Sequence, residues 1–236
     1  MSEPDTFAVW PPAGSPLSLT SWWRELVGLA ECIAVPPPFP EDAARGRGQH
    51  VIVLPGFCSP NLATARLRDF LTRQGFRPRP WDLGINFGPT SVTLRSLERQ
   101  IVAAANECGA PIALVGLSLG GTIAREMAKR QPDLVSRVIT LASPIRVPVA
   151  TTLAPLAKLA SELWDKDSRA DLSRIAEPPP VPVTAIITRS DGLIDWQSCV
   201  PEPAPNVEAI IIEGMHVTIG SNPAAQRIVA ARLALS

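Results

Sequence analysis

At 236 residues, the chain is long enough to bury the core of one α/β domain. Its 22 Lys and Arg residues balance 22 Asp and Glu residues, and this zero formal net charge, with no basic run, argues against a nucleic-acid partner. The four cysteines are scattered without metal-ligand spacing, and no P-loop or dinucleotide motif occurs, so we expect no metal and no cofactor.

The N-terminus lacks the pattern of a secretory signal, because Glu3 and Asp5 precede any basic residue and prolines interrupt the segment. No stretch of the sequence approaches the roughly 18 consecutive apolar residues that a membrane-spanning helix needs. We therefore expect no membrane span and a cytoplasmic location.

Residues 1–48 are expected to form an N-terminal extension with one amphipathic helix, over Leu17–Val35, and a proline-rich linker. The helical spacing gathers an apolar stripe, made of Leu19, Trp22, Trp23, Leu26, Leu29, Ala30 and Ile33. We favour packing of this apolar stripe on the following domain, while a lid, a dimer contact and a membrane-surface helix stay open. Arg24 and Glu25 are the only charges near the middle of the helix, too few for a basic membrane-binding face.

From residue 49 onward, short apolar runs alternate with amphipathic helical patterns, as in a mostly parallel sheet flanked by helices. The predicted strands cover residues 50–55, 76–81, 112–117, 135–141, 182–188 and 207–212. The predicted helices cover residues 60–74, 90–108, 119–131 and 222–235. The predicted fold class is therefore α/β, with residues 49–236 as one domain.

The first predicted strand begins at His50 and ends in the turn Pro55-Gly56-Phe57. His50 therefore lies at the end of the sheet opposite to that turn, roughly 15–20 Å away at the rise of a strand. A histidine at the start of a strand is typically a solvated surface residue, and this is what we expect of His50.

The third predicted strand runs into Gly116-Leu117-Ser118-Leu119-Gly120, a G-x-S-x-G motif between a strand and a helix. The turn is so tight that side chains at the flanking positions would collide with the strand and the helix, which explains both glycines. Ser118 is the predicted nucleophile. The backbone amides of Leu119 and Phe57 are the predicted oxyanion donors, one after the nucleophile and one after the first strand.

Residues 144–177 interrupt the alternation of strands and helices and predict a small helical cap insert. Leu153, Leu156 and Trp164 lie on the apolar side of a helical pattern within it. These three residues are candidates for lining a substrate pocket, and plain packing is the alternative interpretation.

Polar loops follow the last two predicted strands, and they carry Asp191 and Asp195 in the first and His216 in the second. Because His50 lies at the other end of the sheet, His216 is the predicted base. Asp191 is favoured as the acid, since it is closer to the end of its strand and precedes Gly192. Asp195 could instead cap a short helix that follows it.

Taken together, these segments resemble α/β-hydrolases, on the bacterial esterase and lipase side. The stretches that carry the resemblance are Val51–Phe57, Trp81–Gly88, Gly116–Gly121 and the loops of Asp191 and His216. The resemblance implies a triad of Ser118, His216 and Asp191, in the chain order of that fold. It also implies that Asn86 holds neighbouring loops together by hydrogen bonds.

The turn after the first strand departs from the lipase pattern. Pro55-Gly56 stands where many lipases carry His-Gly, which favours a general carboxylesterase. The expected function is therefore cofactor-independent hydrolysis of a small-molecule carboxylic ester through an acyl-enzyme. An acyltransferase or thioesterase would use the same triad, and a non-catalytic binding module on the same fold is the alternative from another class.

Overall fold

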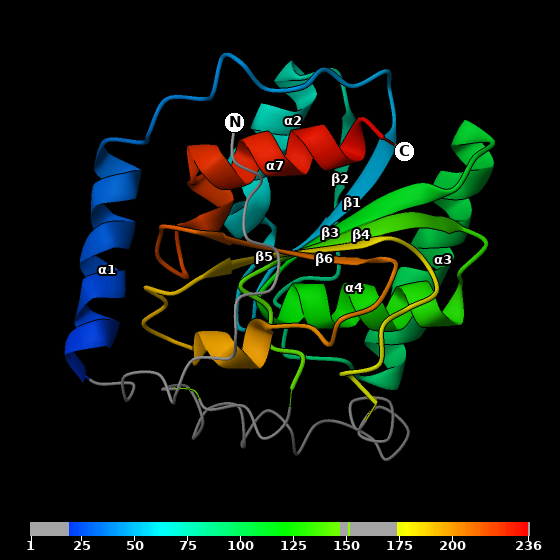
Figure 1. Ribbon diagram of the computed structural model, residues 1–236. Helices are drawn as coiled ribbons and strands as arrows, with labels where there is room; N and C mark the ends of the chain where they lie inside the picture. The colour runs from blue at the N-terminus through cyan, green and yellow to red at the C-terminus, as the bar shows by residue number, and fades with distance from the viewer. Residues whose placement is uncertain (1–18, 147–150, 152–173, 236) are drawn as a thin grey trace.

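The computed structural model describes residues 19–146, 151 and 174–235 (Figure 1). Six strands form one parallel sheet in the order β2-β1-β3-β4-β5-β6. The strands are β1 (His50–Leu54), β2 (Arg77–Pro80), β3 (Ile112–Leu117), β4 (Val135–Leu141), β5 (Val183–Thr188) and β6 (Val207–Ile212). The predicted α/β fold is confirmed, and every predicted strand is present to within one residue at either end.

The helices also follow the predicted order. The α-helices are α1 (Leu19–Ala34), α2 (Ala65–Arg73), α3 (Ser91–Cys108), α4 (Leu119–Arg130) and α7 (Pro223–Leu233). The short 3-10 helices are η1 (Asn61–Thr64), η2 (Trp196–Cys199) and η3 (Ile219–Ser221). Local sequence sets both ends of α3. At its start, the side chain of Thr90 accepts a hydrogen bond from the amide of Thr93, and at its end Gly109 adopts the left-handed backbone conformation.

Two helical layers cover the sheet (Figure 1). Helices α2 and α7 pack with Val51 and Val53 on one face, whereas α3 and α4 pack with Ile52 and Leu54 on the other. Successive residues of a strand point to opposite faces, so a strand covered on both faces needs an unbroken apolar run. This requirement explains why the central strands read as continuous hydrophobic segments in the sequence.

The sheet has a switch point between β1 and β3. The chain leaves β1 through α2 on one face to reach β2, and it returns through α3 on the other face to β3. Strands β1 and β3 are neighbours in the sheet, with Leu54 opposite Gly116. Ligands of open α/β sheets bind in the crevice beyond the carboxyl ends at such a point. The turn after β1 and the serine after β3 therefore flank the place where a site is expected.

Helix α1 lies outside both helical layers, beside the loops that follow β5 and β6 (Figure 1). Trp23 is 63% exposed and Ile33 is 73% exposed, so the predicted packing of the apolar stripe on the domain core is wrong. Within residues 20–34, the side of the helix that is buried or half-buried consists of Ser21, Glu25, Gly28 and Cys32. Periodicity identifies an amphipathic helix, but it does not say which side docks.

His50 is only 4% exposed, so the expectation of a solvated surface histidine is wrong. Its Nδ1 atom is buried and has no hydrogen-bond partner among the described residues. Burial lowers the pKa of His50 below its ordinary value of 6.5, and the nearby Arg79 and Arg77 lower it further, whereas Glu107 partly opposes them.

Protonation of His50 should therefore favour the unfolded state. As the pH falls below about 6.5, the unfolded chain binds a proton at this histidine before the folded chain does, and stability is lost. We expect the His50→Gln variant to lose less free energy of unfolding than the parent between pH 7.5 and pH 5.5, as measured by urea denaturation. Equal losses in the two proteins would contradict this.

Candidate active site

Ser118 sits at a sharp turn between β3 and α4. Its backbone has φ 50° and ψ −126°, a region that residues other than glycine rarely occupy. The turn is held on both sides, because the Ser118 amide donates to the carbonyl of Leu141 at 2.8 Å and its carbonyl accepts the amide of Gly121 at 2.9 Å. The hydroxyl therefore lies at the N-terminal end of α4, where the helix dipole favours negative charge.

The glycines on either side of Ser118 are required by close approach, as predicted. A Cβ atom on Gly116 would lie 2.3 Å from the amide nitrogen of Gly121 in α4. A Cβ atom on Gly120 would lie 2.5 Å from the carbonyl oxygen of Pro55, in the turn after β1. A Cβ atom on Gly56 would in turn be 3.2 Å from the Cβ of Ser118. The turn after β1 thus lies directly beside the serine.

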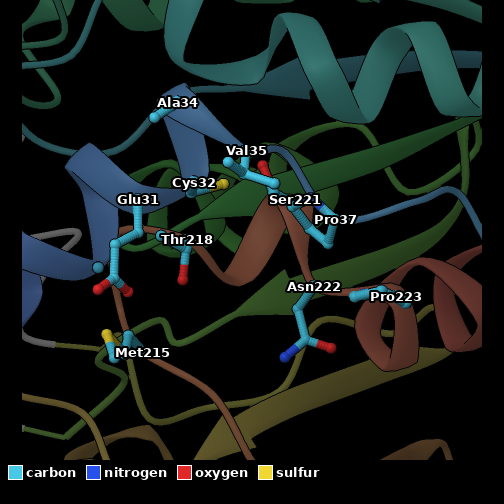
Figure 2. A pocket seen from close by; sticks show the side chains of 11 residues that line it. Glu31, Cys32, Ala34, Val35, Pro37, Met215, Thr218, Ser221, Asn222 and Pro223 are labelled. Atoms are coloured by element: carbon cyan, nitrogen blue, oxygen red, sulfur yellow. The ribbon is translucent and has the colours of Figure 1, made fainter.

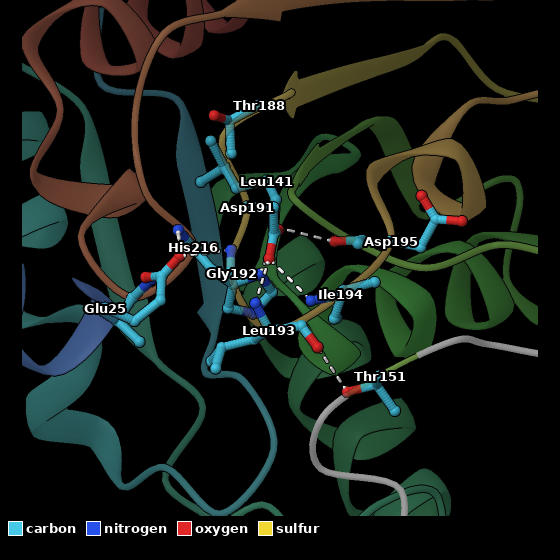
Figure 3. Close-up of polar contacts among 12 residues, drawn as sticks. Glu25, Leu141, Thr151, Thr188, Asp191, Gly192, Leu193, Ile194, Asp195 and His216 are labelled. Atoms are coloured by element: carbon cyan, nitrogen blue, oxygen red, sulfur yellow. Dashed lines mark hydrogen bonds and ion pairs between the residues drawn. The ribbon is translucent and has the colours of Figure 1, made fainter. Parts of the chain in front are cut away.

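Asp191 and His216 meet although they come from different loops (Figure 3). Nδ1 of His216 donates to Oδ2 of Asp191 at 2.6 Å, and the side chain of Asp191 is 1% exposed. The other carboxylate oxygen of Asp191 accepts the amides of Leu193 at 2.9 Å and Ile194 at 2.8 Å. These amides fix the carboxylate, and the carboxylate fixes the imidazole tautomer, so that Nε2 is left without the proton.

Asp195, the alternative acid, caps a helix instead. Its Oδ1 atom accepts the amide of Gln197 at 3.2 Å, at the start of η2. Its backbone carbonyl also accepts the hydroxyl of Ser198 at 2.6 Å. Of the two aspartates in this loop, the structure therefore brings Asp191 to the histidine and gives Asp195 the capping contacts.

The loop that carries His216 is anchored at both ends. Asn222 donates from its side chain to the carbonyl of Glu213 at 2.8 Å, and its Oδ1 atom accepts the amide of Ala224 to cap α7. The hydroxyl of Thr188, at the end of β5, donates to the carbonyl of Gly214. These contacts tie the histidine loop to the strand that precedes the acid loop.

Sequence reasoning missed Glu25, which reaches this pair of loops from α1. The residue is 1% exposed, and its carboxylate accepts the backbone amides of Gly192 and His216 (Figure 3). It also accepts the backbone amide of Val217. The partners lie 167 or more residues away in the chain, so no local pattern predicts the contacts. The sequence does hold one signal for the docking side of α1: small or polar residues recur every three or four positions along an otherwise apolar helix.

The predicted oxyanion donors flank Ser118. Among the loop and turn hydrogen bonds of the described residues, none uses the amide of Phe57 or of Leu119. Leu119 is the first residue of α4, where amides have no partner within the helix. Both amides belong to segments held against the serine turn, Phe57 after Gly56 and Leu119 directly after Ser118.

Asn86 holds the Phe57 segment in place, as the resemblance implied. Its side-chain amide donates to the carbonyl of Pro55 at 2.8 Å, and its backbone carbonyl accepts the amide of Cys58 at 2.8 Å. Its side-chain oxygen accepts the amide of Gly88 at 3.0 Å. The residue is fully buried, so these contacts are not shared with solvent.

We expect Asn86→Asp to lower the free energy of unfolding by about 1–3 kcal/mol, because an oxygen would replace the donor that faces the Pro55 carbonyl. Urea denaturation at neutral pH measures this loss. Asn106→Asp, on the exposed surface of α3, is the matched control and should change stability by less than about 0.5 kcal/mol. Equal effects of the two substitutions would contradict a holding role for Asn86.

Neither Cys58 nor Cys199 competes with Ser118 as a nucleophile. The four thiols are free. Burial raises the pKa of Cys58, which follows the Phe57 turn, above its ordinary value. Burial also raises the pKa of Cys199 well above its ordinary value, and the Asp191 charge adds to this. Thiols with raised pKa values are protonated at neutral pH and poorly nucleophilic.

Most of the predicted cap insert lies outside the described residues, including Leu153, Leu156 and Trp164. Thr151, which is described, forms an isolated antiparallel bridge with Ile194 and donates its hydroxyl to the carbonyl of Leu193 at 2.7 Å. The insert therefore contacts the acid loop at this residue.

A separate cavity of about 470 Å³ lies between the C-terminal half of α1 and the histidine loop (Figure 2). Its lining includes Cys32, Val35, Met215 and Thr218 but not Ser118. Within the described ranges, no cluster of His, Cys, Asp and Glu side chains could hold a metal ion. None of the helices in that part of the chain has the length and apolar character to cross a membrane.

Comparison with known proteins shows the family of the chain. Residues 96–215, about half of the chain, match the PGAP1-like alpha/beta domain. The chain belongs to this family. The matched residues of the chain include Ser118 and Asp191 and end one residue before His216. A search of curated proteins found no match.

Solved structures resemble the chain in fold. A monoacylglycerol lipase from Paleococcus ferrophilus is 16% identical with a TM-score of 0.59, over 82% of this chain and 96% of that one. Lipase B from Aspergillus fumigatus is 16% identical with a TM-score of 0.61, over 83% and 55% of the two chains. A naproxen esterase from Bacillus subtilis is 14% identical with a TM-score of 0.54, over 82% and 84%. The expected α/β-hydrolase superfamily is thereby confirmed.

Proposed function

We propose that the protein is a cofactor-independent serine hydrolase that cleaves carboxylic esters. The observation that carries the proposal is the 2.6 Å contact between His216 and Asp191, at the same end of the sheet as the strained Ser118 turn. A serine in a sharp turn after a strand, a histidine after a later strand and an acid oriented toward that histidine are the parts that acyl transfer requires.

In the first half of the reaction, Ser118 Oγ attacks the ester carbonyl carbon. His216 accepts the hydroxyl proton at Nε2, because Nδ1 is engaged with Asp191. The amides of Phe57 and Leu119 donate to the oxyanion that develops in the tetrahedral intermediate, each contributing about 2.7–4 kcal/mol by analogy with similar donors. His216 then passes its proton to the leaving alkoxide as the carbon–oxygen bond breaks, and an acyl-enzyme remains.

In the second half, a water molecule takes the place of the alcohol. His216 accepts a proton from this water as it attacks the acyl carbon, and the serine oxygen leaves with the proton from the histidine. The products are one alcohol and one carboxylic acid. Asp191 keeps its charge throughout and stabilises the imidazolium that forms in each half-reaction.

The substrate class we propose is a small to medium apolar ester, held in part by the cap insert. Leu153, Leu156 and Trp164 are the proposed lining of the acyl or alcohol pocket. The support for this part is the apolar side of their helical pattern together with the contact of Thr151 with the acid loop.

Hydrolysis of 4-nitrophenyl esters with acyl chains of increasing length tests the proposal. The expected result is a burst of nitrophenol equal to the enzyme concentration, then steady turnover that depends on chain length. Repeating the assay with an added alcohol acceptor separates hydrolysis from acyl transfer, since a transferase would form a new ester. Folded protein that binds the esters without releasing nitrophenol would contradict the proposal and support a non-catalytic binding module.

A further inference from the structure

We propose that Glu25 is a positioning residue that holds the acid loop and the histidine loop at the spacing their contact needs. The inference rests on the proposed function, because it concerns the same Asp191–His216 pair. Oε1 of Glu25 accepts the amide of Gly192 at 2.7 Å and the amide of His216 at 3.0 Å. Oε2 accepts the amide of Val217 at 3.0 Å. One carboxylate thus bridges the residue after the acid and the histidine itself (Figure 3).

The hydrogen-bond partners of Glu25 explain how its carboxylate can be buried. Withdrawing a carboxylate from water costs several kcal/mol unless its oxygens are satisfied. Glu25 is 1% exposed and, within the described residues, makes no ion pair with a Lys, Arg or His side chain. Backbone amides of the two loops satisfy it instead, in charge-assisted hydrogen bonds. The buried charge is therefore compensated only while both loops keep their present places.

The helix approaches the two loops closely on either side of Glu25. A Cβ atom on Gly192 would lie 2.6 Å from the carbonyl oxygen of Ser21, one turn before Glu25. A Cβ atom on Gly28 would lie 2.3 Å from the sulfur of Met215, one turn after it. The C-terminal half of α1 and the histidine loop line the cavity of about 470 Å³ (Figure 2). Glu25 thus lies between the two positions of close approach.

This geometry links Glu25 to chemistry without contact with the substrate. Oε1 holds the amides of Gly192 and His216 to one atom. Gly192 directly follows Asp191, whose carboxylate meets the imidazole of His216 at 2.6 Å. A misplacement of about 1 Å in a reacting group can lower a rate about 100-fold. Loosening this bridge should therefore lower the rate of the chemical step and leave substrate affinity nearly unchanged.

The Glu25→Gln substitution tests the inference. A glutamine that keeps its oxygen on Gly192 and His216 turns its NH₂ group toward the amide of Val217, so a hydrogen bond is lost and two donors oppose each other. We expect kcat to fall by about 10–100-fold, KM to stay within about twofold and fluorophosphonate labelling to slow in step with kcat. Glu31→Gln makes the same charge change at an exposed residue of α1 that lines the cavity, and it is the matched control that should behave like the parent.

A spectroscopic measurement reads the positioning directly. The chain has two histidines, so the His50→Gln background leaves His216 as the only imidazole in a proton NMR spectrum. The Nδ1 proton shared with Asp191 should resonate far downfield in this background. It should move upfield or broaden away when Glu25→Gln is added, whereas Glu31→Gln should leave it in place.

The outcomes separate this inference from the proposed function. If the parent neither labels nor hydrolyses esters, the proposed function fails, and the NMR signal still tests the positioning by Glu25. If the parent is active and folded Glu25→Gln keeps both the parental kcat and the downfield signal, the positioning role is overturned while the function stands. If Glu25→Gln does not fold, Glu25→Asp takes its place, with the same loss of kcat expected; parental kcat in that variant overturns the inference.

Discussion

Replacing Ser118 with alanine is expected to lower ester turnover by at least about 10⁴-fold, because loss of the nucleophile in a serine hydrolase removes the acyl-enzyme route. Alanine keeps the Cβ atom that the positive-φ backbone already accommodates, so the fold should be preserved. The measurement is kcat with a 4-nitrophenyl ester, with circular dichroism as the test of folding.

The control for this experiment is Cys58→Ala. Cys58 directly follows the Phe57 turn, and partial loss of solvent around its free thiol raises the pKa. Its removal should leave turnover within about threefold of the parent. If folded Ser118→Ala kept parental turnover, or if Cys58→Ala abolished it, the proposed mechanism would be wrong.

Asp191→Asn is expected to lower kcat by about 10⁴-fold, as replacement of the acid does in other serine hydrolase triads. The amides of Leu193 and Ile194 hold one carboxylate oxygen, so an asparagine must keep its oxygen there and turn its NH₂ group toward His216. That group would donate to Nδ1 and force the ring proton to Nε2, where it blocks transfer from the serine. The measurement is kcat against pH from 6 to 9.

Asp195→Asn is the matched control in the same loop. Asparagine caps helices about as well as aspartate, so the contact with the Gln197 amide should persist. We expect kcat within about threefold of the parent. A severe effect of this substitution together with a mild effect of Asp191→Asn would reverse the assignment of the acid.

Much of this arrangement could be predicted from the sequence because its signals are local. The strands are continuous apolar runs, the Ser118 turn has its glycines at the two positions of close approach, and a polar loop follows each of two late strands. The choice between Asp191 and Asp195 stayed open for a physical reason. A turn that presents a carboxylate and a helix cap use the same residue type, and only the fold shows which of them meets His216.

The parts that could not be predicted depend on contacts between distant segments. The predicted docking of α1 through its apolar stripe is wrong, since the side that docks is built from Ser21, Glu25, Gly28 and Cys32. Hydrophobic periodicity assumes that apolar side chains dock, whereas α1 is attached by a buried carboxylate and by glycine contacts. The burial of His50 is also absent from the sequence pattern, because burial at the start of β1 depends on neighbours from distant segments.

The central claim is that Ser118 is an activated nucleophile, and covalent labelling by a fluorophosphonate tests it most directly. We predict one phosphonyl group per chain, located by mass spectrometry on Ser118, absent from the Ser118→Ala variant and formed far more slowly in Asp191→Asn. Folded parent protein that stays unlabelled, or that carries the group on another residue, would contradict the proposed serine hydrolase.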